Sequence, residues 1–180
     1  GNPRRTRTVV AALLCFVLVA TSYVTWRRAS RAHAHESAEP VPLTTFAGAE
    51  LSPSLSPDGS HVAFAWNGED RQNWDVYATV IGGGRAVRLT TNPLSDTAPS
   101  WSPDGRFICF LRSSSRPAHG VADVIVMSAL GGSERKIAEI DVTNRYWARP
   151  VWTRDSQYVI VPDRAAPNLP HALFAISRES

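Results

Sequence analysis

The chain has 180 residues, of which 43% are hydrophobic, so it is long and apolar enough to fold around a core. Its formal net charge of +3 is unevenly distributed, because residues 1–35 contain six arginines and no acidic residue. In the remainder, the other 13 basic residues are outnumbered by all 16 acidic residues. This distribution argues against a basic, nucleic-acid-binding surface on the folded part of the chain.

An apolar segment without charged residues extends from Thr8 to Trp26. As a helix with a rise of about 1.5 Å per residue it would be about 28 Å long, close to the roughly 30 Å hydrocarbon core of a bilayer. Tyr23 and Trp26 suit a membrane interface, and arginines flank both ends of the segment. We therefore predict one transmembrane helix over residues 8–26, preceded by a cytoplasmic juxtamembrane stub over residues 1–7.

Two alternatives remain for this segment. A secretory signal peptide would fit Ala32-His33-Ala34, which has the small-x-small pattern of a cleavage site. The basic residues Arg27, Arg28 and Arg31 favour an anchor instead, because positive charges after an apolar run stop its transfer. A buried core helix is the second alternative. Three arginines lie on each side of the segment, so charge leaves its orientation open.

Residues 27–42 contain alanine, histidine, serine and proline without periodicity, which predicts a linker. His33 and His35 lack a third ligand nearby, so we interpret them as solvated linker residues and not as a metal site. Cys15 lies in the apolar segment and Cys109 in a predicted core strand, so no internal disulfide is expected.

The rest of the chain contains a segment that occurs twice, at residues 52–64 and 98–110. Both copies have Ser-Pro-Asp-Gly followed by a short apolar run. A third, degraded copy begins at Pro150 and has Arg154-Asp155-Ser156 in place of Pro-Asp-Gly. Self-similarity at this spacing, with strand-like content, predicts the blades of a β-propeller.

The repeated motif has the composition of a tight turn. In Pro57-Asp58-Gly59 and Pro103-Asp104-Gly105, proline presets φ, aspartate bonds its own backbone and glycine accepts positive φ. We therefore interpret these residues as structural, and not Asp58 and Asp104 as paired catalytic carboxylates. Strand-like apolar runs follow each turn, at Val62–Trp66, Phe107–Leu111 and Tyr158–Val161.

Each of the first two copies continues with a second apolar run, a glycine-rich hairpin turn and a last short strand. Four antiparallel strands of this kind make one blade. We predict an all-β fold over residues 43–180, an incomplete β-propeller of about three four-stranded antiparallel blades, preceded by the transmembrane α-helix. The predicted blades cover residues 51–90, 97–140 and 147–180.

Leu43-Thr44-Thr45 repeats Leu89-Thr90-Thr91, which ends the fourth strand of the first blade. We interpret residues 43–45 as a strand of a closing blade that lies beyond Ser180. The third blade has sequence for three strands, and propellers close with about four to eight blades. The natural protein is therefore expected to continue past residue 180.

The combination of Ser-Pro-Asp-Gly, Asp75-Val76-Tyr77, Gly-Gly and Arg88-Leu89-Thr90 resembles the TolB-like (PD40, WD40-like) propeller repeat. Phe64–Glu69 with Asn73–Tyr77 is similar to the sensor half of bacterial single-span regulators. In those proteins a CadC- or ToxR-type winged-helix domain, or a serine/threonine kinase domain, precedes the membrane helix. The resemblance implies a single-pass protein of the bacterial inner membrane with an extracytoplasmic, periplasmic propeller.

Motifs for enzymatic chemistry are missing from the sequence. It has no Gly-x-Ser-x-Gly for a hydrolase and no Asp-x-Asp-x-Asp-Gly loop for calcium. Gly82-Gly83-Gly84 lacks the Lys-Ser/Thr tail of a phosphate loop, and the five histidines are scattered. We predict no catalytic residue, no cofactor and no metal.

Recognition is expected in the loops. Asn67–Asn73 and Ser113–Gly120 join second and third strands and are predicted to share one face. Asn92–Asp96 and Asp141–Arg149 join blades and are predicted to lie on the opposite face, near the mouth of the central channel. Candidate interaction residues on that second face are Tyr146, Trp147, Arg149 and Asp96. Packing of the two aromatic residues between blades is the alternative.

The predicted function is a non-enzymatic sensing or protein-interaction propeller that binds a protein or a small molecule and no nucleic acid. Residues 8–26 would tether it to the membrane and to a cytoplasmic effector outside these residues, and homodimerisation is left open. One alternative is a secreted periplasmic scaffold of the TolB type. Another is the propeller of a prolyl-oligopeptidase-type peptidase whose catalytic domain lies elsewhere.

Overall fold

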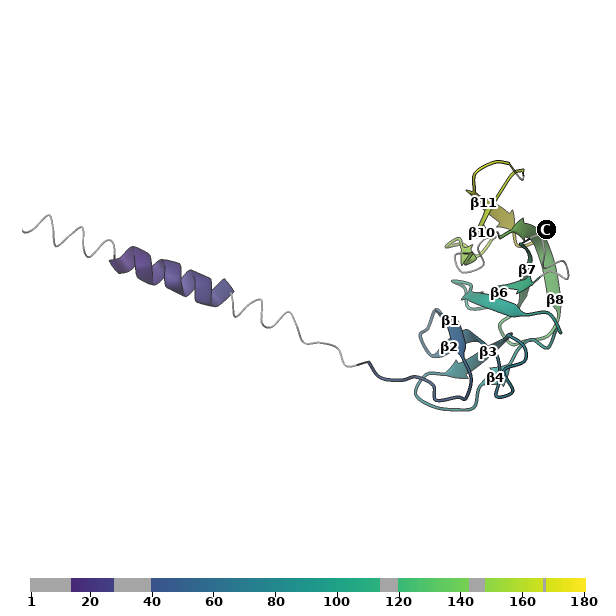
Figure 1. Ribbon diagram of the computed structural model, residues 1–180, viewed down its shortest axis with the longest axis horizontal. Helices are drawn as coiled ribbons and strands as arrows, with labels where there is room; N and C mark the ends of the chain where they lie inside the picture. The colour runs from purple at the N-terminus through teal and green to yellow at the C-terminus, as the bar shows by residue number, and fades with distance from the viewer. Residues whose placement is uncertain (1–13, 28–39, 114–119, 143–147, 167) are drawn as a thin grey trace, which may run out of the picture. The chain divides into compact units, whose positions relative to one another are not determined.

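The computed structural model describes residues 14–27, 40–113, 120–142, 148–166 and 168–180. The chain divides into two compact units, Gly1–Val41 and Pro42–Ser180 (Figure 1). In the first unit a helix covers residues 14–27. Within the described ranges, no helix combines the length and the apolar character that crossing a bilayer requires. Residues 8–13 of the predicted span lie outside the described residues.

The second unit contains three antiparallel sheets (Figure 1). The first has the order β1-β2-β3-β4, with β1 (Glu50–Leu55), β2 (His61–Trp66), β3 (Asp75–Val80) and β4 (Val87–Arg88). The second has the order β5-β6-β7-β8, with β5 (Asp96–Trp101), β6 (Phe107–Ser113), β7 (Val121–Ser128) and β8 (Glu134–Asp141). The third has the order β11-β10-β9, with β9 (Val151–Trp152), β10 (Tyr158–Asp163) and β11 (Ala172–Ser177).

The prediction of an all-β unit with three antiparallel sheets is confirmed, and each of the first two sheets has four strands. The last strand of the first sheet, β4, is short as predicted and has only Val87 and Arg88 in the ladder. Residues 43–45 are not part of a strand in the described structure, so their place in a closing blade stays a prediction.

The first strands of the three sheets are linked to one another directly. The Trp101 backbone N–H of β5 donates to Ser54 Oγ of β1 over 2.9 Å. The Trp152 indole N–H of β9 donates to the Ser100 carbonyl of β5, also over 2.9 Å. A succession of sheets joined through their first strands is the arrangement of blades around a propeller axis.

The hydrophobic core consists of layers between the sheets. In β6 the neighbouring residues Ile108 and Cys109 are both completely buried. Because side chains alternate along a strand, they point to opposite faces. Ile108 belongs to the cluster shared with the first sheet, and Cys109 to the cluster shared with Val159 of the third. The second sheet is therefore covered on both faces, which explains why its strands are apolar without alternation.

One hydrogen-bonded turn joins the first two strands of every sheet. In the first sheet, the Ser56 hydroxyl donates to Asp58 Oδ1 over 2.5 Å. The same carboxylate accepts the Ser60 backbone N–H over 3.0 Å, and Ser56 Oγ accepts the His61 N–H over 2.9 Å. This hydroxyl–carboxylate clamp satisfies two backbone donors at the point where β2 begins.

The third copy of this clamp has the same geometry although its sequence is degraded. The Thr153 hydroxyl donates to Asp155 Oδ1 over 2.5 Å, and the Tyr158 N–H donates to Thr153 Oγ over 3.0 Å. Ser156 takes the place of glycine with φ of 58°, in the left-handed region. Its buried hydroxyl accepts the Asp104 N–H of the neighbouring sheet over 3.1 Å. This contact between sheets explains a serine where glycine would be less strained.

The segment before β1 covers the outer face of the first sheet. The ring of Phe46 lies 5.1 Å from that of Trp66, and the Trp66 indole N–H donates to the Ala47 carbonyl over 2.8 Å. Gly48 has φ of 100°, and a Cβ atom there would lie 2.6 Å from the Gly68 carbonyl oxygen. Glycine at this position therefore allows two backbone segments to approach each other closely.

The clamps predict a loss of stability in acid. Hydrogen bonds from the Ser56 hydroxyl, the Ser60 backbone and the Ser60 hydroxyl lower the pKa of Asp58 from 3.8 to about 2. The Thr153 hydroxyl and the Gln157 N–H likewise lower the pKa of Asp155. A folded-state pKa below the unfolded value stabilises the fold above the unfolded pKa, and this stabilisation is lost as pH falls through the folded pKa.

We therefore expect the free energy of unfolding to decrease between about pH 4 and pH 2, measured by urea denaturation at each pH. The variant Asp58→Asn should have a flatter pH dependence in this window. Asp70→Asn, in the exposed β2–β3 loop, is the control and should follow the native chain. Identical profiles for all three proteins would contradict the role of the clamp.

Gly48→Ala should destabilise the second unit by about 1–3 kcal/mol, because the added methyl group combines a strained φ with a backbone collision. Gly82→Ala is the matched control, since Gly82 also has positive φ but open space around its Cβ position. Chemical denaturation should therefore show a larger loss for Gly48→Ala. Equal losses for the two variants would show that close approach at Gly48 is unimportant.

Candidate functional site

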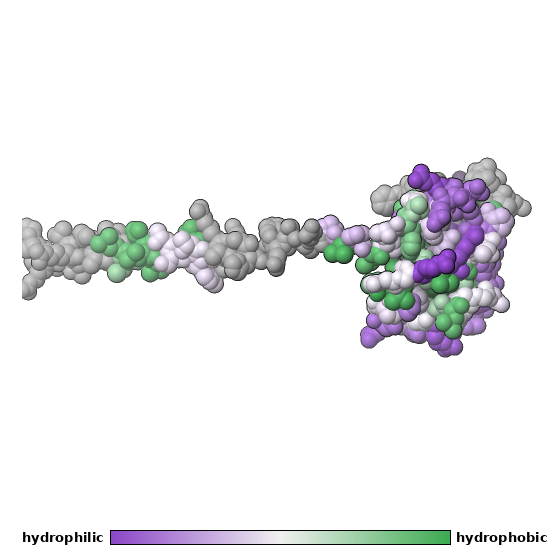
Figure 2. All heavy atoms as spheres, turned by 90° about the horizontal axis from the view of Figure 1, so that it is seen from below, coloured by the Kyte–Doolittle hydropathy of each residue, from purple (hydrophilic) through white to green (hydrophobic). Residues whose placement is uncertain are grey.

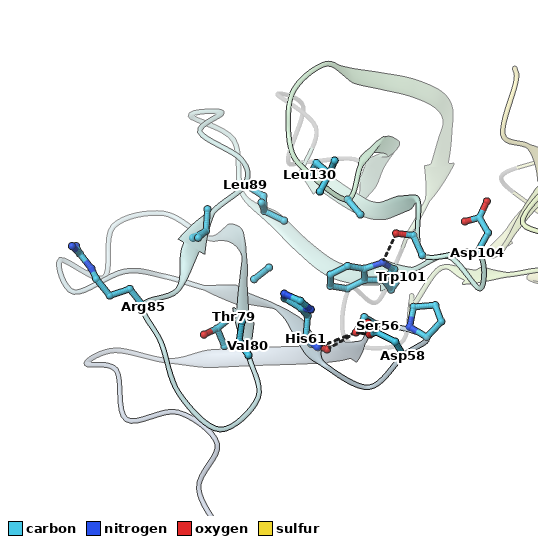
Figure 3. Close-up of a pocket in the computed structure, with 15 residues that line it drawn as sticks. Ser56, Asp58, His61, Thr79, Val80, Arg85, Leu89, Trp101, Asp104 and Leu130 are labelled. Carbon is cyan, nitrogen blue, oxygen red and sulfur yellow. Dashed lines mark hydrogen bonds between the residues drawn. The ribbon is translucent and has the colours of Figure 1, made fainter.

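A pocket of about 550 Å³ opens between the first and second sheets (Figure 3). We call it the inter-sheet groove. Its apolar lining consists of Ala78, Val80, Val87, Leu89, Trp101, Ala129 and Leu130. Its polar lining includes Ser56, Asp58, His61, Thr79, Arg85 and Asp104. The groove therefore combines an apolar floor with a few charged groups, as is usual for binding sites.

The strand connectivity explains why these residues meet. The β1–β2 and β5–β6 turns lie at the same ends of their sheets as the β3–β4 and β7–β8 turns, because the strands run up and down. At the mouth of the groove, Leu130 in the β7–β8 turn is 97% exposed and Val87 of β4 is 61% exposed. Hydrophobic patches on the surface of this unit are visible among hydrophilic ones in Figure 2. Large apolar side chains this exposed are available for a partner.

Charges of opposite sign lie at the two ends of the groove. Asp58 and Asp104, one from each of the two clamps, lie at one end, and Arg85 lies at the other (Figure 3). Burial acts to raise the pKa of Asp104, but the Ser102 hydroxyl and the Arg106 N–H outweigh it and lower that pKa overall. The carboxylates at this end therefore stay ionised at neutral pH.

His61 points into the groove beside Trp101, with 6.1 Å between the ring centroids (Figure 3). The Ser60 hydroxyl lies 2.7 Å from His61 Nδ1 and donates to Asp58 Oδ2 over 2.8 Å. Because ionised Asp58 can only accept, the single hydroxyl proton goes to it, and His61 Nδ1–H donates to Ser60 Oγ. In a hydrolase triad the carboxylate contacts the histidine, and the histidine accepts the serine proton. Here the carboxylate of Asp58 contacts the serine, and the histidine donates to the serine oxygen instead of accepting its proton.

Of the four predicted interaction residues, the structure describes only Asp96 and Arg149. Asp96 is completely buried, and Arg112 donates to both its carboxylate oxygens over 2.7 and 2.8 Å. The prediction that Asp96 is part of an accessible face is therefore wrong, because this carboxylate is needed for a buried ion pair. Arg149 is exposed, whereas Tyr146 and Trp147 lie outside the described residues.

The Asp96–Arg112 pair extends across the second sheet. Arg112 Nη1 lies 2.7 Å from Glu134 Oε2, so the guanidinium connects β6 with both β5 and β8. Burial raises the pKa of Asp96, and the hydrogen bonds and charge of Arg112 oppose this rise. Removal of one partner would leave a buried charge uncompensated, so the network is structural.

The prediction that the Asn67–Asn73 loop and the Asn92–Asp96 connection lie on opposite faces is also wrong. The Asn73 side-chain amide of the β2–β3 loop donates to the Asn92 carbonyl of the β4–β5 connection over 2.8 Å, and Ser95 Oγ donates to Asn73 Oδ1 over 3.2 Å. Both connections therefore lie on one face. In an up-and-down sheet of four strands, the second and fourth strands end at the same edge, and the prediction overlooked this.

The β2–β3 loop, which the sequence suggested for recognition, lines a second pocket of about 350 Å³. Its lining is mainly polar and includes Asn67, Glu69, Asp70, Gln72 and Arg88. Within the described part of the chain, no group of three or more histidine, cysteine, aspartate or glutamate side chains is arranged to hold a metal ion.

The motif residues Asp58 and Asp104 lie in turns, as predicted, and they also flank the inter-sheet groove, which was not predicted. Its apolar floor comes from β3, β4, β5 and the connections that follow β4 and β7, so no local sequence pattern marks it. The one available signal was Leu130, an apolar residue directly before a Gly-Gly turn, where polar residues are usual.

Solved structures show the same fold. TolB from Acinetobacter baumannii superposes with a TM-score of 0.63 and 17% identity over 80% of this chain and 33% of that one. A putative TolB from Agrobacterium tumefaciens superposes with a TM-score of 0.56 and 22% identity, over 75% of this chain and 48% of that one. The β-propeller domain of the Trilobed protease from Pyrococcus furiosus superposes with a TM-score of 0.54 and 19% identity, over 75% of this chain and 40% of that one. This chain thus spans less than half of each of these structures.

No curated protein sequence matches the chain significantly. The family model of the TolB beta propeller domain, PD40, matches residues 30–179. That match includes all three sheets, their three clamps and the inter-sheet groove. The chain therefore belongs to the TolB-like β-propeller family.

Proposed function

We propose that this propeller is a non-enzymatic protein-interaction module that binds an extended segment of a partner in the inter-sheet groove. The observation that carries the proposal is the exposed apolar mouth of the groove, where Leu130 is 97% exposed. An accessible apolar floor flanked by fixed charges provides both affinity and orientation for a peptide. The contacts of His61 with Ser60 support a binding role over hydrolysis, because they do not make the serine a nucleophile.

Selection of peptides from a random phage-displayed library by the full chain tests this function. Enriched peptides should bind the variant Leu130→Glu at least about tenfold more weakly, because a charge replaces the apolar contact at the mouth. Leu169→Glu is the matched control, since Leu169 is 50% exposed and does not line the groove. Peptides that bind both variants as well as the native chain would contradict the proposal.

We further propose that the propeller is the extracytoplasmic, sensing part of a single-span protein of the bacterial inner membrane. The uncharged apolar segment at residues 8–26, with arginines on both sides, supports this location. A bound partner would shift an equilibrium that is relayed to a cytoplasmic DNA-binding or kinase domain. A secreted periplasmic scaffold is the second candidate, favoured by the cleavage-site pattern at Ala32-His33-Ala34.

Topology mapping separates these two candidates. Alkaline phosphatase fused after Ser180 should be active in both, because both place the propeller outside the cytoplasm. The anchored protein should keep its N-terminus and resist carbonate extraction from membranes. Mass spectrometry of a soluble scaffold should instead show a new N-terminus after Ala34. An inactive fusion would refute both locations and leave the peptide-binding function untouched.

A further inference from the structure

The second and third sheets form an equivalent junction, in which Arg178, Phe107 and Trp152 pack together, and we call this filled junction the second groove. Ala129 and Arg178 hold equivalent positions, because each directly follows the third strand of its sheet. Their N–H groups donate to the Arg106 and Gln157 carbonyls, each over 2.9 Å. His61 and Phe107 are equivalent in the same way, since each begins the strand after a clamp. The same backbone frame therefore presents different side chains in the two grooves.

In the second groove this chain supplies its own guanidinium group. The Arg178 guanidinium carbon lies 4.7 Å from the centroid of the Phe107 ring. The Phe107 ring in turn stacks on Trp152, with 6.4 Å between the centroids. The Arg178 guanidinium donates to Glu179 Oε1 over 2.9 Å, and its charge also acts on Asp104 of the adjacent clamp. A cation over an aromatic face beside a carboxylate is a favourable arrangement.

In the inter-sheet groove the same frame lacks the guanidinium. Ala129 has only a methyl group where the second groove has Arg178. The aromatic pair is still present, because His61 lies against Trp101 as Phe107 lies against Trp152. The carboxylate is present as well, because Asp58 occupies the clamp position that Asp104 has in the second groove. The side-chain space left by Ala129 is part of the 550 Å³ pocket.

We propose that the inter-sheet groove binds an arginine side chain of a partner protein, stacked on His61 and Trp101 beside Asp58. This inference rests on the proposed function and specifies the partner residue. Arginine fits better than lysine, because a planar guanidinium stacks on a ring while it bonds a carboxylate, whereas an ammonium is a strongly hydrated point charge. An apolar residue next to the arginine would contact Leu89 and Leu130 at the mouth.

The test uses the full chain and the peptide acetyl-Leu-Arg-Leu-amide, titrated by NMR. The reference peptide contains citrulline, which has the shape of arginine but no charge. The arginine peptide should shift the Trp101 indole signal and bind about tenfold more tightly than the citrulline peptide. Nuclear Overhauser contacts between the arginine side chain and the Trp101 ring should locate it in the native chain, without any substitution.

The variant Ala129→Arg should fill the groove with the chain's own guanidinium and reduce binding of the arginine peptide at least about tenfold. Ala166→Arg adds the same charge at an exposed position outside the groove and should bind like the native chain. His61→Phe reproduces the aromatic pair of the second groove and should retain binding. Signal dispersion in the NMR spectrum verifies that each variant is folded.

Equal affinity for the arginine and citrulline peptides would overturn this inference. So would library peptides that bind in the groove and contain no arginine, and both results would leave the proposed interaction function intact. If the selected peptides are insensitive to Leu130→Glu, the interaction function itself is refuted. The two failures are therefore distinguishable.

Discussion

The structure depends on the hydroxyl–carboxylate clamp that joins the first two strands of each sheet. A serine or threonine hydroxyl donates to an aspartate, and together the two side chains accept the backbone N–H groups at the start of the next strand. Each clamp thereby determines the residue at which the second strand begins. Because strand side chains alternate between faces, this start also determines which residues enter each layer between sheets. Ile108 packs toward the first sheet and Cys109 toward the third only if β6 begins at Phe107.

The same turns give the propeller its surface chemistry. A clamp needs an ionised aspartate for structural reasons, and the chain places these aspartates at the edge of every space between sheets. One difference between the spaces is the residue that follows the third strand, alanine at 129 and arginine at 178. The arginine makes an intramolecular contact with Phe107 in one space, whereas the alanine lines the open groove in the other. Repeat proteins diversify in this way, because their repeats share one backbone fold while the side chain at each position varies independently.

Much of the fold could be predicted from the sequence, because its signals are local and repeated. Ser-Pro-Asp-Gly followed by an apolar run identified the turns and second strands, and even the degraded Arg154-Asp155-Ser156 was aligned correctly. Features that depend on distant residues were not predictable. The burial of Asp96 depends on Arg112 and Glu134 from two other strands. The cation–π contact of Arg178 depends on Phe107, which is distant in the sequence. The face on which a loop lies depends on the direction of every strand in its sheet, and this direction places the β2–β3 loop and the β4–β5 connection on one face.

The complete burial of Cys109 gives the propeller an internal chemical reporter. Burial raises the pKa of its thiol, so both solvent exclusion and the lack of thiolate protect it from alkylating reagents. Its layer exists only while the second and third sheets remain in contact. The rate at which this thiol becomes modified therefore measures how often neighbouring blades separate, a motion that spectroscopy of the exposed loops would not detect.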